Sequence, residues 1–365
     1  MRFPEFSGEW EKTLLNHYLE ENKERNKKGV FTKNNVLSVS GDYGVVNQIE
    51  LLGRSFAGKS VLDYHVVRNG NIVYTKSPLK EYPYGIVKVN EGIDGIVSTL
   101  YAVYTVKENA NGKFIENYFG LPRRTNRYFK PIVRIGAKHD MKIGNDEVLA
   151  NFVIFPRVDE QKRISEFISL LDRRIATQKK VIEKYESLIR GLCEKLTRQG
   201  DTNKSINECL ECHSSTLQES EVLDTGRYPV YGAIGVCGYT DTPDVSGDGI
   251  LIIKDGASVG VTYFADGCYS SIGTLNRLTA KQGINLRYVY YCLKVMNFAP
   301  YKTGLAIPHI YFKDYGKHKI WCPSFEQQSR IADALTNIGN KIHVEKLLLE
   351  QLNSQKRYML NQLFI

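Results

Sequence analysis

The sequence lacks the features that mark membrane, exported and disulfide-rich proteins. No run of about 18 apolar residues occurs, which is roughly the length that a helix crossing a bilayer needs. The first residues contain no apolar signal-peptide core, so we expect a cytoplasmic chain that contacts no membrane. Seven cysteines are scattered over 365 residues, and such a sparse, odd set is typical of reduced thiols rather than of a disulfide framework.

The chief feature that is present is a long internal repeat. Residues 156–198 and 323–365 align without a gap at a constant offset. Identical residues recur along the alignment, among them Pro156 and Pro323, Gln161 and Gln328, Ile175 and Ile342, and Leu196 and Leu363. A repeat of this length, interrupted by a non-repeated segment, predicts a molecule of two halves.

Both copies of the repeat carry apolar residues at alternating steps of four and three, which is the a/d spacing of a coiled coil. We expect two long helices that bury these stripes against each other and against partner proteins. The residues assigned to this coiled-coil and partner surface are Ile164, Ile168, Leu171, Ile175, Ile182, Ile331, Leu335, Ile338, Ile342 and Leu349. Gln178 and Glu345 interrupt the stripes at equivalent places, where one polar residue fixes register. The plainer alternative is that each amphipathic helix packs only on its own domain.

The repeat divides the chain into four segments. These are a first globular domain (1–155), a long helix (156–198), a second globular domain (199–322) and a second long helix (323–365). Strand-like runs at 84–89, 96–106, 148–155, 249–254 and 259–264, with a helical stretch near 285–297, predict mixed α/β domains. An Asn-Gly turn at 68–71 predicts a hairpin between 66–67 and 72–74. The expected fold class is α+β, with two mixed α/β domains separated by two long helices that pair as an intramolecular coiled coil.

Basic residues gather at the end of each globular domain, just before its helix. Residues 113–142 hold eight lysines and arginines against Glu116 and Asp140, with aromatic residues between them. Residues 294–319 hold five lysines against Asp314, again with tyrosines between them. Such clusters suit a surface that contacts phosphate, although a solvated basic face is the plainer reading. The second domain as a whole is slightly acidic, so its DNA-facing surface is less clearly marked.

The order domain–helix–domain–helix resembles the specificity subunit of type I restriction–modification systems, with its two target-recognition domains and two helical spacer regions. The resemblance covers essentially the whole chain. Its motifs are individually loose and are carried by Arg2-Phe3-Pro4-Glu5-Phe6 with Trp10, Tyr228-Pro229-Val230-Tyr231-Gly232, Gly304 with Ile307-Pro308-His309-Ile310, and the helix starts around Pro156-Glu160-Gln161 and Pro323-Glu326-Gln327.

The resemblance implies that each domain reads one half of a split sequence in double-stranded DNA, while the helix pair sets the distance between the halves. It also implies docking of methyltransferase subunits, which bring S-adenosylmethionine, and of restriction/translocase subunits, which bring ATP and magnesium. This chain would hold no cofactor or metal and would catalyse nothing. The favoured DNA-contact residues are Lys59, Arg123, Arg124, Arg127 and Lys130 in the first domain, and Lys302, His309, Tyr311 and Lys313 in the second.

Residues 53–60 read Gly-Arg-Ser-Phe-Ala-Gly-Lys-Ser, which matches the pattern of a phosphate-binding loop. Such a loop needs a helix that begins at its lysine, because the phosphate sits on that helix N-terminus. Residues 61–67 instead resemble a strand, and no convincing apolar strand ends in an aspartate for magnesium. We therefore favour Lys59 as a DNA phosphate contact, and keep a P-loop nucleotide-binding protein as the alternative from another class.

Two further patterns are weaker. Cys209-Leu210-Glu211-Cys212-His213 matches a covalent haem attachment site, but that chemistry needs export, and a zinc site would need a second ligand pair. Glu160-Gln161-Lys162 could belong to a nuclease, but it lies at the start of the heptads and its repeat counterpart has lost it. No Asn-Pro-Pro-aromatic or Asp-Pro-Pro-Tyr motif of adenine methylation occurs. The sequence thus favours a non-catalytic, sequence-specific DNA-binding subunit, with a coiled-coil scaffold that binds only proteins as a third hypothesis.

Overall fold

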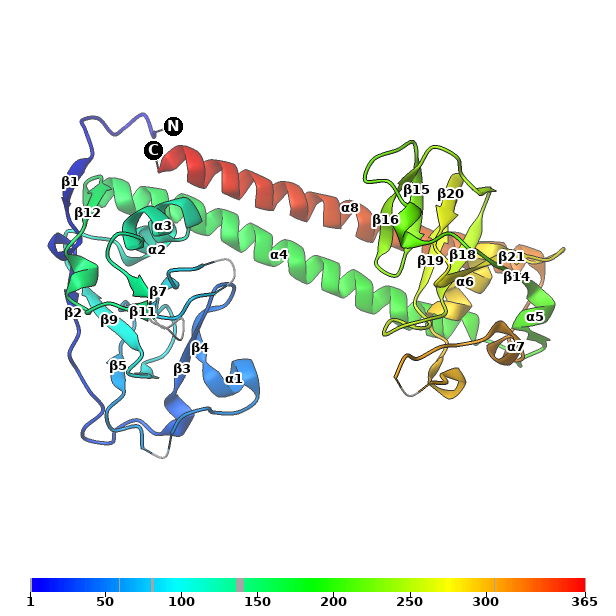
Figure 1. Ribbon diagram of the computed structural model, residues 1–365, viewed down its shortest axis with the longest axis horizontal. Coiled ribbons are helices and arrows are strands. Elements are labelled where there is room, and N and C mark those ends of the chain that lie inside the picture. The colour runs from blue at the N-terminus through cyan, green and yellow to red at the C-terminus, as the bar shows by residue number, and fades with distance from the viewer. Residues whose placement is uncertain (1, 59, 80–81, 136–140, 305, 365) are drawn as a thin grey trace. The chain divides into compact units, whose positions relative to one another are not determined.

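The computed structural model describes residues 2–58, 60–79, 82–135, 141–304 and 306–364 (Figure 1). Two compact units form, unit 1 from Met1–Ala176 with Glu350–Ile365 and unit 2 from Thr177–Leu349. Two long helices, α4 (Val158–Thr197) and α8 (Phe325–Leu363), contribute one part to each unit. We call the part of unit 1 that precedes α4 body one, and the part of unit 2 between α4 and α8 body two.

Body one is built on a four-stranded antiparallel sheet with the order β2-β9-β6-β7. Two-stranded ribbons surround it, pairing β1 with β12, β3 with β4, β5 with β8 and β10 with β11. The strands are β1 (Glu11–Leu14), β2 (Leu19–Glu21), β3 (Leu37–Ser40), β4 (Gly44–Asn47), β5 (His65–Val67), β6 (Ile72–Thr75), β7 (Val87–Val89), β8 (Gly95–Val97), β9 (Tyr101–Val106), β10 (Arg134–Ile135), β11 (Met141–Lys142) and β12 (Phe152–Phe155). The helices are α1 (Gln48–Leu52), α2 (Gly112–Phe119) and α3 (Pro122–Phe129), with short 3-10 turns at Leu15–His17, Lys33–Asn35 and Glu147–Leu149.

Body two has two four-stranded sheets, with the orders β14-β21-β18-β19 and β16-β15-β20-β17, and the ribbon β13-β22. The strands are β13 (Lys204–Ser205), β14 (Leu210–Ser214), β15 (Tyr228–Gly232), β16 (Gly235–Thr240), β17 (Val245–Ser246), β18 (Gly249–Ile253), β19 (Thr262–Ala265), β20 (Cys268–Ser271), β21 (Leu275–Ala280) and β22 (Lys319–Ile320). The helices are α5 (Ile206–Cys209), α6 (Leu286–Lys294) and α7 (Phe312–Tyr315), with 3-10 turns at Glu219–Glu221 and Ala299–Tyr301.

The two bodies share one topology in their sheets, although the β10-β11 ribbon of body one has no counterpart among the described strands of body two. The sheet β2-β9-β6-β7 corresponds to β14-β21-β18-β19, the hairpin β3-β4 to β15-β16, and the ribbon β5-β8 to β17-β20. Even the parallel pairing of β15 with β20 has a counterpart, a parallel bridge between Val36 and Ile96 in body one. After the last strand of each sheet comes a helix capped by an asparagine, Asn111 for α2 and Asn285 for α6. The repeat that is visible in the helices therefore extends through the bodies.

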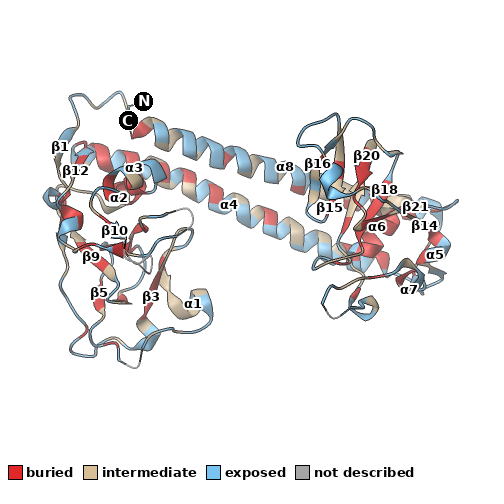
Figure 2. Ribbon diagram, in the orientation of Figure 1, coloured by how far each residue is buried: buried red, intermediate tan, exposed pale blue. Residues whose placement is uncertain are grey.

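Each central sheet is buried on both of its faces. Alternate side chains of a strand point to opposite sides, so neighbouring residues of one strand belong to different cores. In body one, Ile72 and Tyr74 of β6 join the core beneath α2 and α4, and Val73 joins the core beneath the ribbons. In body two, Ile250 and Ile252 of β18 face α6 and the long helices, and Leu251 faces the second sheet. Figure 2 shows these buried residues within each body.

The hairpin expected around the Asn-Gly turn of body one is only half right. The turn forms, with Asn71 N–H donating to Arg68 C=O at 3.1 Å and Gly70 at a φ of 85°. However, β5 pairs with β8, whereas β6 pairs with β7 and β9. The turn therefore joins two different layers of the body instead of two neighbouring strands.

The long helices pack together and confirm the expected fold class. In unit 1, Ile164, Ile168 and Leu171 of α4 share a core with Leu363 and Phe364 at the end of α8. In unit 2, Cys193 of α4 and Ile331 and Leu335 of α8 share the core of body two. None of the described helices combines the length and apolar character that a bilayer crossing needs.

Candidate nucleic-acid interface

Helix α3 of body one presents an exposed basic stripe. Arg123, Arg127 and Lys130 lie at steps of four and three, on one face of the helix, and all three are exposed. The opposite face is held in the core by Tyr128 and Phe129, which are at most 4% exposed. None of the three cations forms an ion pair with a described residue. Their charge is therefore available for a phosphate backbone.

Arg124 has a different environment from its three neighbours. Its Nη2 donates to the backbone carbonyl of Phe364, and its guanidinium carbon lies 4.7 Å from the ring centroid of Tyr118. Arg124 is partly buried by these contacts. The structure thus brings Arg123, Arg127 and Lys130 together and places Arg124 where it fastens the end of α8 to body one.

The segment that matches a phosphate-binding loop lacks the required surroundings. Helix α1 precedes it and ends at Gly53, which has a φ of 75°, and the described residues 60–64 form turns that run into β5. Gln48 holds the loop by accepting from the Phe56 N–H at 2.6 Å, and Arg54 lies 4.6 Å from the Phe56 ring centroid. Lys59 lies outside the described residues. No helix N-terminus is present in residues 60–64 to bind a phosphate.

In body two, the favoured DNA contacts lie in one segment after α6, which runs from Lys302 into the start of α7. Thr303 and His309 pair through both backbone hydrogen bonds, at 2.9 and 2.8 Å, beside exposed Lys302. Tyr311 follows, with the His309 ring 6.1 Å away and Lys313 Nζ 5.3 Å from its ring centroid. The structure therefore brings all four predicted residues to one surface.

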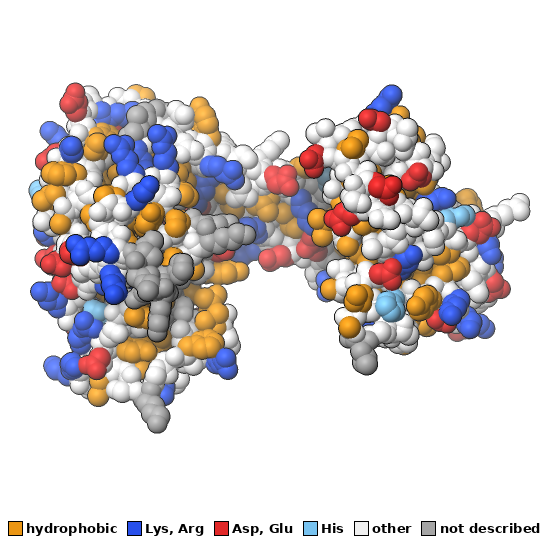
Figure 3. All heavy atoms as spheres, in the orientation of Figure 1, with side chains coloured by type: hydrophobic (Ala, Val, Ile, Leu, Met, Phe, Trp, Pro, Cys, Tyr) orange, Lys and Arg blue, Asp and Glu red, His pale blue; other side chains and the backbone are white. Residues whose placement is uncertain are grey.

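This loop is less basic than the α3 stripe. Asp255 Oδ1 lies 3.7 Å from His309 Nδ1, so a carboxylate lies within the cluster. On the face shown in Figure 3, Lys and Arg side chains predominate on unit 1, whereas Asp and Glu lie among them on unit 2. On this face, the exposed positive charge that a phosphate backbone would meet is thus greater on unit 1 than on unit 2.

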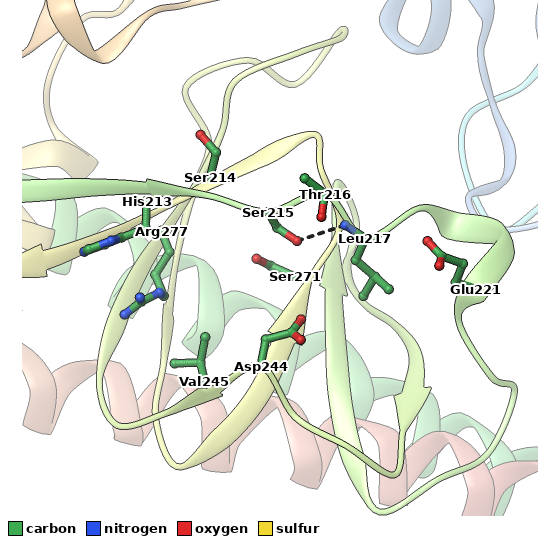
Figure 4. A pocket seen from close by; sticks show the side chains of 10 residues that line it. All are labelled: His213, Ser214, Ser215, Thr216, Leu217, Glu221, Asp244, Val245, Ser271 and Arg277. Atoms are coloured by element: carbon green, nitrogen blue, oxygen red, sulfur yellow. Dashed lines mark hydrogen bonds between the residues drawn. The ribbon is translucent and has the colours of Figure 1, made fainter.

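Body two also contains a polar cavity of about 380 Å³ near the junction of its two sheets. Its lining residues are His213, Ser214, Ser215, Thr216, Leu217, Glu221, Asp244, Val245, Ser271 and Arg277. Figure 4 shows Ser215, Ser271 and Asp244 in the middle of this lining, with Ser215 Oγ accepting from the Leu217 N–H at 3.1 Å. Two carboxylates against one guanidinium make this cavity unsuited to phosphate, although its donors and acceptors match the chemistry of base edges.

The predicted coiled-coil residues fall into two groups. Ile164, Ile168 and Leu171 belong to the core of unit 1, and Ile331 and Leu335 to that of unit 2, so these five also attach the helices to the bodies. Of the others, Ile175, Ile182 and Ile342 are at most 9% exposed. Ile338 and Leu349 are half-buried. The helices therefore pack both on each other and on the bodies.

The two polar residues that interrupt the stripes contact each other. Gln178 Nε2 donates to Glu345 Oε2 at 2.5 Å and to the Glu345 backbone carbonyl at 3.0 Å. Lys341 adds an ion pair to Glu345 at 2.7 Å. The hydrogen bonds from Lys341 and Gln178 hold the pKa of the Glu345 carboxyl below its usual range. One polar contact at equivalent positions of the repeat thus fixes the register of the helix pair.

The hydrogen bonds at the junction between each body and its long helix were not predicted from the sequence. Gln161 is fully buried; it accepts from Asn111 N–H at 2.9 Å and donates to Pro156 C=O at 2.9 Å. Gln328 makes the same pair of bonds, from Asn285 N–H and to Pro323 C=O, both at 2.8 Å. The signal was present, because Gln161 and Gln328 are identical repeat positions.

In body one, an ion pair also joins the N-terminal segment to the start of the long helix. Arg2 Nη2 lies 2.6 Å from Glu160 Oε2, and Trp10 Nε1 donates to Glu160 Oε1 at 3.3 Å. Glu160 is 2% exposed and fully engaged by these partners. Its role is therefore structural, which agrees with the scaffold reading of Glu160-Gln161-Lys162.

The Cys-x-x-Cys-His segment is divided between two structural elements. Cys209 ends α5 and is buried, whereas Cys212 and His213 lie on β14, where His213 Nε2 is 2.9 Å from Thr279 Oγ1. Burial raises the pKa of the Cys212 thiol. In the described part of the chain, no three His, Cys, Asp or Glu side chains are grouped so that they could hold a metal ion.

Known proteins that resemble this chain are specificity proteins of type I restriction systems. Residues 202–354 match the type I restriction modification DNA specificity domain. The MjaVIII type I restriction enzyme specificity subunit of Methanocaldococcus jannaschii is 33% identical over 124 residues, and the Escherichia coli EcoprrI specificity subunit is 28% identical over 116 residues. These matches cover 33% and 30% of this chain and 29% of each relative, so the aligned part spans less than a third of either one.

Solved structures match over nearly the whole chain. The type I restriction–modification S subunit from M. genitalium superposes with a TM-score of 0.66 at 17% identity, covering 98% of this chain and 96% of that one. A chain from a structural study of complex assembly and conformational transition of the type I R-M system gives a TM-score of 0.57 at 15% identity, covering 99% and 98%. At these identities the likeness shows the fold.

The fold defines a class of protein in which two topologically equivalent mixed α/β bodies are attached to a pair of long helices. The matching domain and the relatives specify that class further. Residues 202–354 match the type I restriction modification DNA specificity domain, and over nearly its whole length the chain has the fold of a type I restriction–modification S subunit.

Proposed function

We propose that this chain reads a bipartite sequence in double-stranded DNA, one half per body, for a type I restriction–modification complex. The observation that carries this proposal is the equivalent sheet topology of two bodies whose surfaces differ. One frame used twice with different side chains suits the recognition of two different half-sites. The exposed α3 stripe of body one and the loop at residues 302–313 of body two supply cations for phosphate contacts.

The helices would hold the half-sites at a fixed spacing. Helix α4 has 40 residues and α8 has 39, and at about 1.5 Å per residue each is roughly 60 Å long. Gln178 and Glu345 would keep the two helices from sliding past each other.

The remaining helix surface would dock the other subunits. Exposed apolar side chains outside the stripes include Leu188, Val344 and Leu347 in unit 2, which are 46–54% exposed. We assign these surfaces to methyltransferase subunits, with restriction/translocase subunits joining the assembly. The partners would bring S-adenosylmethionine, ATP and magnesium, and this chain would contribute recognition without catalysis. A nucleotide site at residues 53–60 is not favoured, because turns and a strand follow that loop.

The test is to map methylated bases across the genome of cells that express this chain with its methyltransferase subunit. We expect a two-part motif with a fixed spacer that appears only when this chain is present. Active methylation whose pattern ignores this chain would refute the proposal. Binding to the motif should also weaken as salt rises, since phosphate contacts release counterions.

A further inference from the structure

The two bodies carry the same unusual feature at the tips of equivalent hairpins. In the β3–β4 hairpin, Tyr43 directly precedes Gly44, which has a φ of 73°. In the β15–β16 hairpin, Ile234 directly precedes Gly235, which has a φ of 98°. Tyr43 is 70% exposed and Ile234 is 87% exposed. A large apolar side chain thus stands at the same place on two hairpins of unrelated sequence.

At each tip, a polar side chain forms hydrogen bonds with the backbone. Ser40 Oγ accepts from the N–H groups of Asp42 and Tyr43, each at 3.3 Å. In body two, the Tyr263 hydroxyl donates to the Ala233 carbonyl at 3.0 Å. Different residues therefore stabilise the same presentation, and a preorganised tip loses less entropy when it binds.

The surroundings of the tips fit base edges better than phosphate or protein. Residues 40–44 and 232–235 contain no lysine or arginine, so phosphate contacts must come from elsewhere. A single side chain on a narrow turn is also too small for the buried centre of a stable protein interface, which needs a broad patch. A two-stranded β-ribbon, however, fits the major groove of B-DNA, where apolar side chains contact the thymine methyl group.

We propose that the β3–β4 and β15–β16 hairpins enter the groove of duplex DNA and that Tyr43 and Ile234 contact bases there. This inference rests on the proposed function and specifies which elements read the two half-sites. The α3 stripe and the loop at residues 302–313 would position each body on the backbone, and the tips would contribute to sequence discrimination. Each tip would then serve one half-site only.

The experiment uses the complete complex of this chain with its methyltransferase subunits. Tyr43→Ser and Ile234→Ser are compared with Val30→Ser and Leu223→Ser, which alter apolar residues that are 72% and 48% exposed in the same two bodies. We measure the affinity for a duplex with the methylated motif, the affinity for an unrelated duplex, and the motif methylated in cells. Co-purification of the methyltransferase subunit reports on assembly.

We expect each tip variant to lose roughly tenfold or more in affinity for the specific duplex, which is the usual cost of one lost base contact. Each should relax the motif in one half only, a different half for each variant, while non-specific binding and assembly stay unchanged. The two control variants should match the unmodified chain.

Two results would overturn the inference. In the first, both tip variants keep the motif and the affinity of the unmodified chain; in the second, they lose the methyltransferase subunit instead of DNA. In either case the proposed function stands if the unmodified complex still methylates a bipartite motif. Absence of any defined motif in the unmodified complex would refute the proposed function itself.

Discussion

Body one and body two have one topology and two different surfaces. Between the fourth and fifth strands, body one inserts α1 and the loop that carries Arg54 and Phe56, whereas body two has only the short connection from Thr240 to Val245. Body one carries the basic α3 stripe, whereas body two carries Asp255 within its basic loop and a cavity with two carboxylates. The strands therefore form a common frame, and the connections between them hold the variable content.

The two helix junctions are, in contrast, nearly the same. Gln161 and Gln328 make matching hydrogen bonds to the caps of α2 and α6 and to the prolines that precede the long helices. A buried side chain that satisfies several backbone groups tolerates little change, because any group left unpaired costs free energy. The repeat is therefore visible in the amino-acid sequence of the helices but not in that of the bodies, where only the topology repeats.

We expect the largest effect on the free energy of unfolding at the C-terminal ends of the two long helices, where their packing differs most. Phe364 directly follows α8 and lies in the aromatic core of unit 1, 5.2 Å from Phe114 between ring centroids, and it is 3% exposed. Phe364→Ala should lower the free energy of unfolding of unit 1 by about 3–5 kcal/mol. At the equivalent end of α4, Thr197→Ala removes one hydrogen bond to Cys193 C=O and should cost about 1 kcal/mol. Urea unfolding measures both, with exposed Tyr358→Ala as the control; equal costs at the two ends would contradict this contrast.

The next effect should be alike in the two units. Gln161→Ala and Gln328→Ala each leave a helix-cap N–H and a proline carbonyl unpaired in the core, which should cost about 2–4 kcal/mol. The neighbouring Lys162→Ala and Gln327→Ala change exposed residues and should be nearly neutral. Thermal unfolding of the four variants checks this. A large cost in only one unit would show that the junctions are not equivalent.

Acidification should weaken body one through His65. This side chain is 1% exposed, and burial, followed by the charge of Arg25, lowers its pKa to about 4. In the unfolded chain a histidine takes up its proton near pH 6.5, so the folded state loses stability as the pH falls from about 6.5 toward 4. Between pH 7 and pH 5 the loss should be about 2 kcal/mol.

His65→Gln tests this assignment, because it removes the titrating group. The variant should lose this share of the pH dependence in unfolding experiments at pH 7 and pH 5. The same pH dependence in the variant and the unmodified chain would exclude His65 as its source.

We expect the smallest effects from charge reversals on the two basic surfaces, which change the affinity for DNA. Arg123→Glu with Arg127→Glu should weaken DNA binding by about tenfold or more at low salt and reduce the salt slope by about 2. Lys302→Glu with Lys313→Glu should have a smaller effect, since Asp255 already offsets the charge there. Fluorescence anisotropy over a salt series measures both. The matched control is Arg190→Glu with Arg357→Glu on the long helices, and a larger loss from body two would reverse the order proposed here.

Local patterns predicted much of this molecule. The heptad spacing predicted both long helices, and the residues around 285–297 predicted α6. The polar breaks at Gln178 and Glu345 were read from spacing, and the structure places the two side chains in contact. These features depend on residues that are close in sequence or on a periodic pattern, so the sequence displays them directly.

Non-local pairing was not predictable in the same way. The Asn-Gly turn was recognised, but the choice of β8 as the partner of β5 depends on the packing of the whole body. The position of Arg124 depends on Phe364, which lies 240 residues away in the sequence. The equivalence of the bodies was hidden because backbone pairing is preserved while the side chains differ.

The most direct test of the central claim is to shorten both helices by one heptad and map the methylated motif. Removal of residues 177–183 and 344–350, which are equivalent in the repeat, takes out Gln178 and Glu345 together, so neither is left unpaired, and keeps the apolar stripes in phase. Each helix loses roughly 10 Å, or about three base pairs of DNA. We expect both half-sites to stay the same and the spacer between them to become shorter by about that amount. An active complex with an unchanged spacer, or with altered half-sites, would contradict it.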